Sequence, residues 1–236
     1  MALPQVVLPT YELELPSNGK KIKYRPFVVK EEKVLLLALE SGDDKQIEDA
    51  TRTLLKNCIQ SRVKVDDLPI FDLEYIFLNI RAVSVGEVVE MLLTCEDDGE
   101  TQVKYNLNLT EVLVDKPEGH DSKIMLSDTM GLIMKYPSFE EFVKISIIGK
   151  DASSEVIEIM AKSVDQIFDG EDVYDSSTTS KKEFVQFLEN LTNSQFEKIQ
   201  DFFSTAPRLE HTITITNPNT GVDNKVVLSG LSSFFG

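Results

Sequence analysis

The chain has 236 residues, and its 24 Lys and Arg residues against 40 Asp and Glu residues give a formal net charge of −16. Binding to nucleic acids or to anionic membranes depends on basic side chains that neutralise phosphate, so we expect neither kind of partner. Because 42% of the residues are hydrophobic, the chain is too apolar for a disordered protein and should fold.

The two cysteines and the first residues indicate the compartment. Cys58 lies in a helical pattern and Cys95 at the edge of a hairpin, so we expect two unpaired thiols in a reducing compartment. Residues 1–9 lack the basic and long apolar regions of a secretion signal, and no apolar run approaches the ~20 residues that cross a bilayer. We therefore expect a soluble protein that is made and used in a cytoplasm.

The first half of the chain predicts two hairpins that flank three helices. Residues 11–15 alternate between apolar and polar, Asn18 and Gly19 suit a type I′ turn, and the alternation resumes over 22–24. Apolar residues at helical spacing predict helices over 28–39, 44–60 and 70–83. The second hairpin is expected over 88–94 and 101–109, with its turn at Asp98-Gly99.

The second half predicts mostly helices, followed by a third hairpin. Residues 124–126 form a short strand, and Ser138 with Glu141 has the spacing of a capping box that opens a helix over 139–150. The elements expected after it are a helix over 153–168, a polar loop over 169–179, helices over 181–190 and 194–204, and a hairpin over 212–216 and 225–228.

These elements predict an α+β fold with two lobes of helices packed with short antiparallel β-hairpins. The N-terminal lobe, residues 1–120, contains a hairpin, three helices and a second hairpin. The C-terminal lobe, residues 121–236, contains the helical set, the terminal hairpin and a Phe-Phe tail. We expect the boundary between them within 110–137.

Tests for chemistry give no catalytic, cofactor-binding or metal site. Residues 95–99 have the spacing of a zinc knuckle, but Asp98 stands at the second thiolate position and the third hairpin has no cysteine, so four zinc ligands do not assemble. The acidic tract 169–175 has its glycine at the wrong position for a calcium loop. His120 and His211 have no nucleophile marked beside them, and no nucleophile elbow, zinc-protease or Walker A spacing occurs.

Five short segments carry a resemblance to a known family, and they are residues 15–33, 68–78, 80–87, 134–137 and 230–235. These segments resemble the baseplate proteins of T-even-like contractile-tailed phages, including those that infect cyanobacteria. The resemblance implies a baseplate hub subunit or hub assembly protein without enzymatic activity, with other tail or baseplate proteins as partners. It also implies a location in the virion, or in the host cytoplasm during assembly. Some members carry paired cysteines in their hairpins, and this chain departs from that pattern.

Three functions stay open at this point. The first is a structural protein of the baseplate hub region that acts through protein–protein contacts, or an assembly chaperone that is absent from the mature virion. The second is a small acidic hydrolase with an unidentified carboxylate pair. The third is a regulator that mimics nucleic acid through its acidity. The sequence predicts no particular oligomeric state.

Two groups of residues are candidates for contacts with a partner. Lys20, Lys21, Lys23 and Arg25 form a basic cluster in an acidic chain, where they either protect a hairpin edge from aggregation or meet an acidic partner. The apolar tail residues are Leu231, Phe234 and Phe235, and they dock either on the protein's own core or on a partner.

Overall fold

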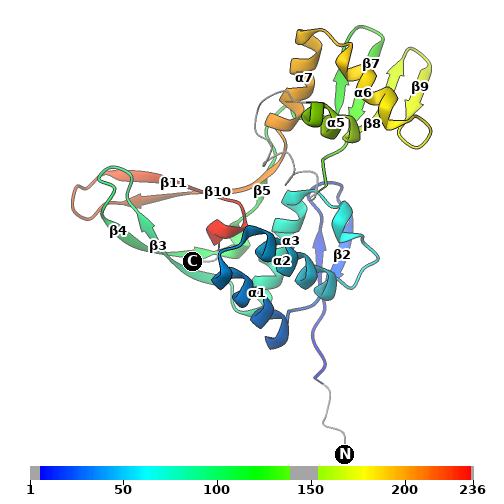
Figure 1. Cartoon of the computed structure of the whole chain (residues 1–236). Coiled ribbons are helices and arrows are strands. Elements are labelled where there is room, and N and C mark those ends of the chain that lie inside the picture. The colour runs from blue at the N-terminus through cyan, green and yellow to red at the C-terminus, as the bar shows by residue number, and fades with distance from the viewer. Residues whose placement is uncertain (1–5, 139–153, 235–236) are drawn as a thin grey trace, which may run out of the picture. The chain divides into compact units, whose positions relative to one another are not determined.

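The computed structural model describes residues 6–138 and 154–234, and these form two compact units (Figure 1). Unit 1 comprises Met1–Val65, Phe71–Asp115 and Arg208–Gly236, and unit 2 comprises Asp66–Ile70 and Lys116–Pro207. Both units combine helices with small antiparallel sheets, which confirms the predicted α+β fold. None of the described helices is long and apolar enough to cross a membrane.

Three α-helices contribute to the interior of unit 1 together with its strands. They are α1 (Val29–Ser41), α2 (Asp44–Cys58) and α3 (Ile70–Ser84). Gly42, with a φ of 64°, ends α1, and the Asp43 carboxylate then caps α2 by accepting from the backbone N–H groups of Lys45 and Gln46. Helix α3 is apolar on most sides and buries Phe71, Ile76 and Phe77, as the sequence predicts. Short 3-10 helices are η1 (Val65–Asp67), η2 (Leu109–Glu111) and η3 (Leu231–Phe234).

The strands of unit 1 form three small sheets. Strands β1 (Tyr11–Glu14) and β2 (Lys21–Tyr24) pair, as do β3 (Val88–Thr94) and β4 (Gln102–Asn108). The third sheet has the order β11 (Asp223–Ser229), β10 (Arg208–Thr216), β5 (Val114–Asp115). All three predicted hairpins are therefore present.

The third hairpin lies in unit 1, which differs from the predicted lobes 1–120 and 121–236. The reason is long-range pairing: Arg208 and Leu209 of β10 pair with Asp115 and Val114 of β5. Apart from Asp66–Ile70, which belong to unit 2, the chain stays in unit 1 as far as residue 115, forms the rest of unit 2, and returns to unit 1 at residue 208.

The three hairpins of unit 1 close with the same kind of turn. In each turn a glycine with positive φ donates its N–H to the carbonyl four residues earlier, and the three pairs are Gly19 to Leu15, Gly99 to Cys95 and Gly221 to Asn217. The predicted type I′ turn at Asn18-Gly19 is wrong, because that turn requires positive φ at both residues and no described residue other than glycine has one. The observed turn is longer than a type I′ turn and needs positive φ only at its glycine.

Unit 2 packs three described α-helices with a four-stranded antiparallel sheet. The strands, in sheet order, are β6 (Lys123–Met125), β7 (Met130–Met134), β8 (Val164–Asp169) and β9 (Asp172–Asp175). The helices are α5 (Ser154–Lys162), α6 (Lys181–Glu189) and α7 (Asn193–Ser204). The core gathers Leu132 and Val164 from the sheet with Phe184, Ile199 and Phe202 from α6 and α7.

The predicted helix over 153–168 is correct only as far as Lys162. From Val164 the chain forms β8, because β-branched Val164 and Ile167 pair on the sheet against β7. The predicted polar loop over 169–179 is also wrong in part, since Gly170 turns the chain into β9 (Asp172–Asp175). The capping boxes of α6 and α7 are confirmed, and the expected helix over 139–150 lies outside the described residues.

Candidate protein–protein interface

Helix α1 exposes apolar side chains on the side opposite the one it buries. Leu35 and Ala38 face the interior of unit 1, whereas Val29, Leu36 and Leu37 are 79%, 51% and 56% exposed. At 3.6 residues per turn these three positions lie on one side, together with three charged residues. We call this side the outer face of α1; its residues are Val29, Lys30, Lys33, Leu36, Leu37 and Glu40.

Sequence analysis did not single out this face, although a signal was present. Residues 34–39 read Val-Leu-Leu-Leu-Ala-Leu, and six consecutive apolar residues cannot all point to one side of a helix. Some of them had to face solvent or another protein.

A buried ion pair fixes the start of α1. The Arg25 guanidinium, at the end of β2, donates to both carboxylate oxygens of Glu31 at 3.0 and 2.7 Å. The Glu31 Oε2 atom also accepts from the backbone N–H of Val28 at 2.9 Å, which caps the helix. The hydrogen bonds from Arg25 lower the pKa of Glu31 against the opposing effect of burial. Burial, aided by the Glu31 charge, raises the pKa of the neighbouring Cys58 thiol to about 11, so this thiol is unreactive.

The predicted basic cluster divides into three exposed lysines and a half-buried arginine. Lys20, Lys21 and Lys23 are exposed, whereas Arg25 is engaged by Glu31 inside unit 1. In the β1–β2 register Lys21 lies opposite Glu14 and Lys23 opposite Glu12, with the Lys23 Nζ atom 3.5 Å from the Glu12 carboxylate. These pairs form a cross-strand charge ladder.

The apolar tail contributes to the interior of unit 1. Phe234, at the end of η3, is 1% exposed, and the turn that leads to it is tied by a hydrogen bond from the Ser233 hydroxyl to the Ser229 carbonyl at 2.7 Å. Leu231 begins η3, and Phe235 lies outside the described residues. Contacts within the protein therefore account for Phe234.

The turns of two hairpins are joined by a polar network that sequence analysis missed. The Asn217 side-chain amide donates to Asp97 and to Asp98, both at 2.9 Å, and the Asn224 amide donates to Asp97 at 3.0 Å. The Thr220 hydroxyl also donates to Asp97. We call this network, Asp97, Asp98, Asn217, Thr220 and Asn224, the loop clasp.

The loop clasp lies where the sequence was tested for a zinc knuckle. Cys95-x-x-Asp98-Gly99 and Asn217-x-x-Thr220-Gly221 have the same spacing, and that shared spacing was the available sequence signal. The pKa of Asp97 is lowered by its hydrogen bonds, and the largest effect comes from Asn217. The pKa of Asp98 is lowered mainly by hydrogen bonds from Thr101. Among the residues that the structure describes, no group of three or more His, Cys, Asp or Glu side chains could hold a metal.

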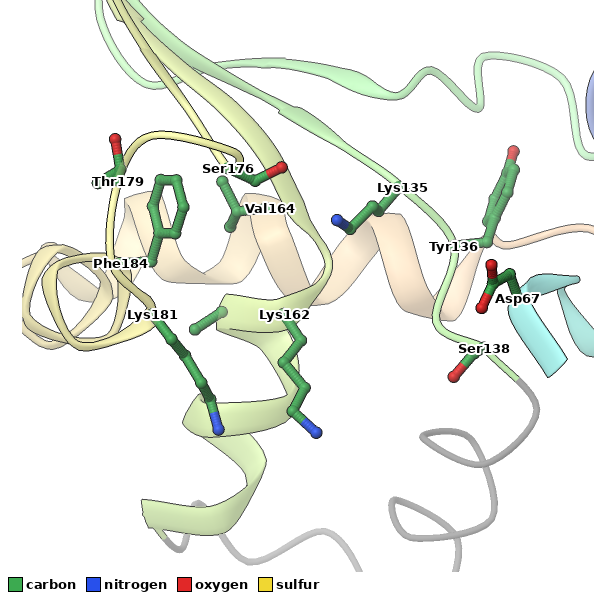
Figure 2. Close-up of a pocket in the computed structure, with 11 residues that line it drawn as sticks. Asp67, Lys135, Tyr136, Ser138, Lys162, Val164, Ser176, Thr179, Lys181 and Phe184 are labelled. Atoms are coloured by element: carbon green, nitrogen blue, oxygen red, sulfur yellow. The ribbon is translucent and has the colours of Figure 1, made fainter. Parts of the chain in front are cut away.

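Unit 2 contains a cavity of about 510 Å³ (Figure 2). Lys135, Lys162 and Lys181 line it together with the apolar side chains of Val164 and Phe184. The Lys181 Nζ atom is 2.8 Å from a Glu158 oxygen, which offsets part of this positive charge. The carboxylate of Asp67 also lines the cavity, so the lining carries charges of both signs, and it includes no histidine to activate a nucleophile.

His120, one of the two histidines considered for catalysis, packs against aromatic side chains of unit 2. Its ring stacks on Tyr136 and Phe202 and makes hydrogen bonds to Thr205 Oγ1 and the Tyr136 hydroxyl, both at 2.9 Å. Burial, followed by the nearby Lys116, lowers its pKa. Both ring nitrogens are thus occupied by these partners.

Comparison with known proteins identifies the family to which the chain belongs. No curated protein and no solved structure matches the chain. The family described as T4 bacteriophage base plate protein matches residues 8–236, which include both units. The chain therefore belongs to the T4 bacteriophage base plate protein family.

Proposed function

We propose that the protein is a non-enzymatic structural component of the hub region of a contractile phage tail baseplate, where it acts through protein–protein contacts. The family match over residues 8–236 carries this proposal, because it spans nearly the whole chain and supports a structural role in the baseplate. A baseplate protein has other tail proteins as partners and the virion tail as its location.

The hub position rests on the segments that resemble hub subunits and hub assembly proteins. Residues 15–33 include β2 and the start of α1, and residues 68–78 include the most buried part of α3. These segments build unit 1 and hold the outer face of α1 in place, which supports a role for unit 1 in docking.

Several surface residues are proposed contacts. The outer face of α1 offers apolar area of the kind that marks protein interaction sites, and Lys20, Lys21 and Lys23 offer positive charge on an acidic protein. Arg25 and Phe234 are engaged inside unit 1, so we do not assign them to a partner.

Mass spectrometry of purified virions and of isolated assembly intermediates tests the proposed function. We expect the protein in both, with chemical cross-links to hub proteins in the virion. Detection only in intermediates would instead identify an assembly chaperone, and absence from both would contradict any baseplate role.

A further inference from the structure

The outer face of α1 carries its charges in a definite order. Lys30 and Lys33 lie in the first half of the helix, Glu40 lies in the last turn, and the apolar residues lie between and beside them. The other two acidic residues of the helix lie outside this face: Glu31 is buried against Arg25, and Glu32 is half-buried. The outer face is thus positive at its start and negative at its end.

This order makes the face complementary to itself. When two copies of α1 pack antiparallel about a two-fold axis, Lys30 of each copy lies opposite Glu40 of the other. The Leu36 side chains then meet beside the axis, and each Lys33 lies next to a Leu37, which its aliphatic stem can cover. Antiparallel packing also places the positive start of each helix macrodipole beside the negative end of the other.

The exposed apolar residues of α1 also indicate that another protein surface covers them. A helix that is apolar on two opposite sides is normally enclosed on both, yet Val29, Leu36 and Leu37 are more than half exposed. Any apolar partner could cover them, but the reciprocal order of Lys30 and Glu40 fits a second copy in particular.

We propose that the protein forms a two-fold symmetric homodimer through the outer face of α1. This deepens the proposed structural function, and rests on it, by naming a second copy of the chain as one partner. A single helix pair buries less area than a standard interface of roughly 800 Å² per partner, so the dimer is expected to be weak, with a dissociation constant on the order of micromolar.

Sedimentation equilibrium of the full chain tests the proposal. We expect a concentration-dependent shift from monomer to dimer across the micromolar range. Leu36→Glu and Leu37→Glu place a charge in the apolar contact, and each should weaken the dimer by about a hundredfold or more. Leu92→Glu is the matched control, because Leu92 is 57% exposed on β3 and lies outside this face. Circular dichroism would verify that every variant is folded.

A charge swap distinguishes a second copy from an unrelated partner. Lys30→Glu alone and Glu40→Lys alone each set like charges opposite one another twice, which should weaken the dimer by about five- to tenfold. An equimolar mixture of the two variants restores both opposite-charge pairs in a mixed dimer, so its affinity should return to that of the unmodified protein.

Three results would overturn the homodimer: a monomer at every concentration, a dimer unaffected by Leu36→Glu and Leu37→Glu, or a mixture that associates no better than either charge variant alone. These results concern the homodimer only, because the proposed function is tested separately by mass spectrometry of virions. A protein found in virions but monomeric in solution refutes the dimer alone.

Discussion

At the scale of single residues, the Arg25–Glu31 pair connects the first hairpin to α1. Glu31 accepts from Arg25 and from the backbone of Val28, so it serves both as the acid of an ion pair and as the helix cap. Removing the guanidinium would leave a buried carboxylate whose remaining donors are the Val28 N–H and the weak, 4.0 Å distant Cys58 thiol.

Arg25→Ala is therefore expected to lower the free energy of unfolding by about 3 kcal/mol, because truncating one partner leaves an uncompensated buried charge. Urea unfolding followed by circular dichroism measures this. Lys23→Ala is the control, since Lys23 is exposed and only 3.5 Å from Glu12, and it should change the free energy by less than about 0.5 kcal/mol. Equal effects of the two substitutions would show that burial of the pair does not matter.

His120 gives unit 2 a pH dependence. Burial lowers the pKa of His120 in the folded protein below the ordinary value of 6.5, so the unfolded chain binds a proton more readily. The contribution of neutral His120 to the free energy of unfolding is therefore fully present above pH 6.5. It is lost as the pH falls below that value, because the unfolded chain then takes up the proton first.

We expect the unmodified protein to lose more thermal stability between pH 7.5 and pH 5.5 than the His120→Gln variant, measured by calorimetry. Asp72, whose pKa is raised by burial, is present in both proteins, so the difference between them reports on the histidine. Parallel losses in the two proteins would refute the role of His120.

At the scale of elements, the first hairpin has a charge ladder whose lysines are also proposed contacts. Lys21→Glu with Lys23→Glu sets four acidic side chains opposite one another across β1 and β2 and should cost about 1 kcal/mol. Adding Glu12→Lys and Glu14→Lys restores the ladder with its signs exchanged.

The variant with all four exchanges should be as stable as the unmodified protein. It should enter virions less efficiently, because the lysines of the ladder then lie on β1 instead of β2. Chemical unfolding and quantitative mass spectrometry of virions give the two readouts. Normal incorporation of this variant would mean that the lysines serve only the hairpin.

The loop clasp depends on one buried amide. Asn217 is fully buried and donates to two carboxylates, so Asn217→Ala removes their shared donor and is expected to cost about 2 kcal/mol. Asn106→Ala, at an exposed position of β4, is the control and should be near neutral. Denaturant midpoints of the two variants test this, and similar midpoints would show that the clasp contributes nothing.

At the scale of the whole molecule, the sequence predicts local structure well and long-range grouping poorly. The capping boxes at Ser180 and Thr192 and the turn glycines locate α6, α7 and the hairpins, because these signals act within a few residues. The strand β8 was missed because Val164 and Ile167 also fit a helical stripe, and only pairing with β7 decides between the two.

The interface could be predicted only in part. The lysines were recognised from charge, but their pairing with Glu12 and Glu14 depends on a hairpin register that the wrong turn type obscured. The pairing of Arg25 with Glu31 and the burial of Phe234 depend on tertiary contacts, as does the exposure of Leu36 and Leu37. Likewise, the joining of β10 to β5 involves residues almost a hundred positions apart and leaves no local pattern.

The insertion of unit 2 within unit 1 has a consequence for the order of synthesis. Domains generally fold as units while the chain is made from its N-terminus, so the earlier part usually closes first. Here unit 2 is complete once residue 207 has been added, whereas unit 1 waits for β10, β11 and Phe234. Unit 1 begins first and finishes last, so β5 has no partner strand until β10 has been made, and during that time the incomplete unit is open to aggregation.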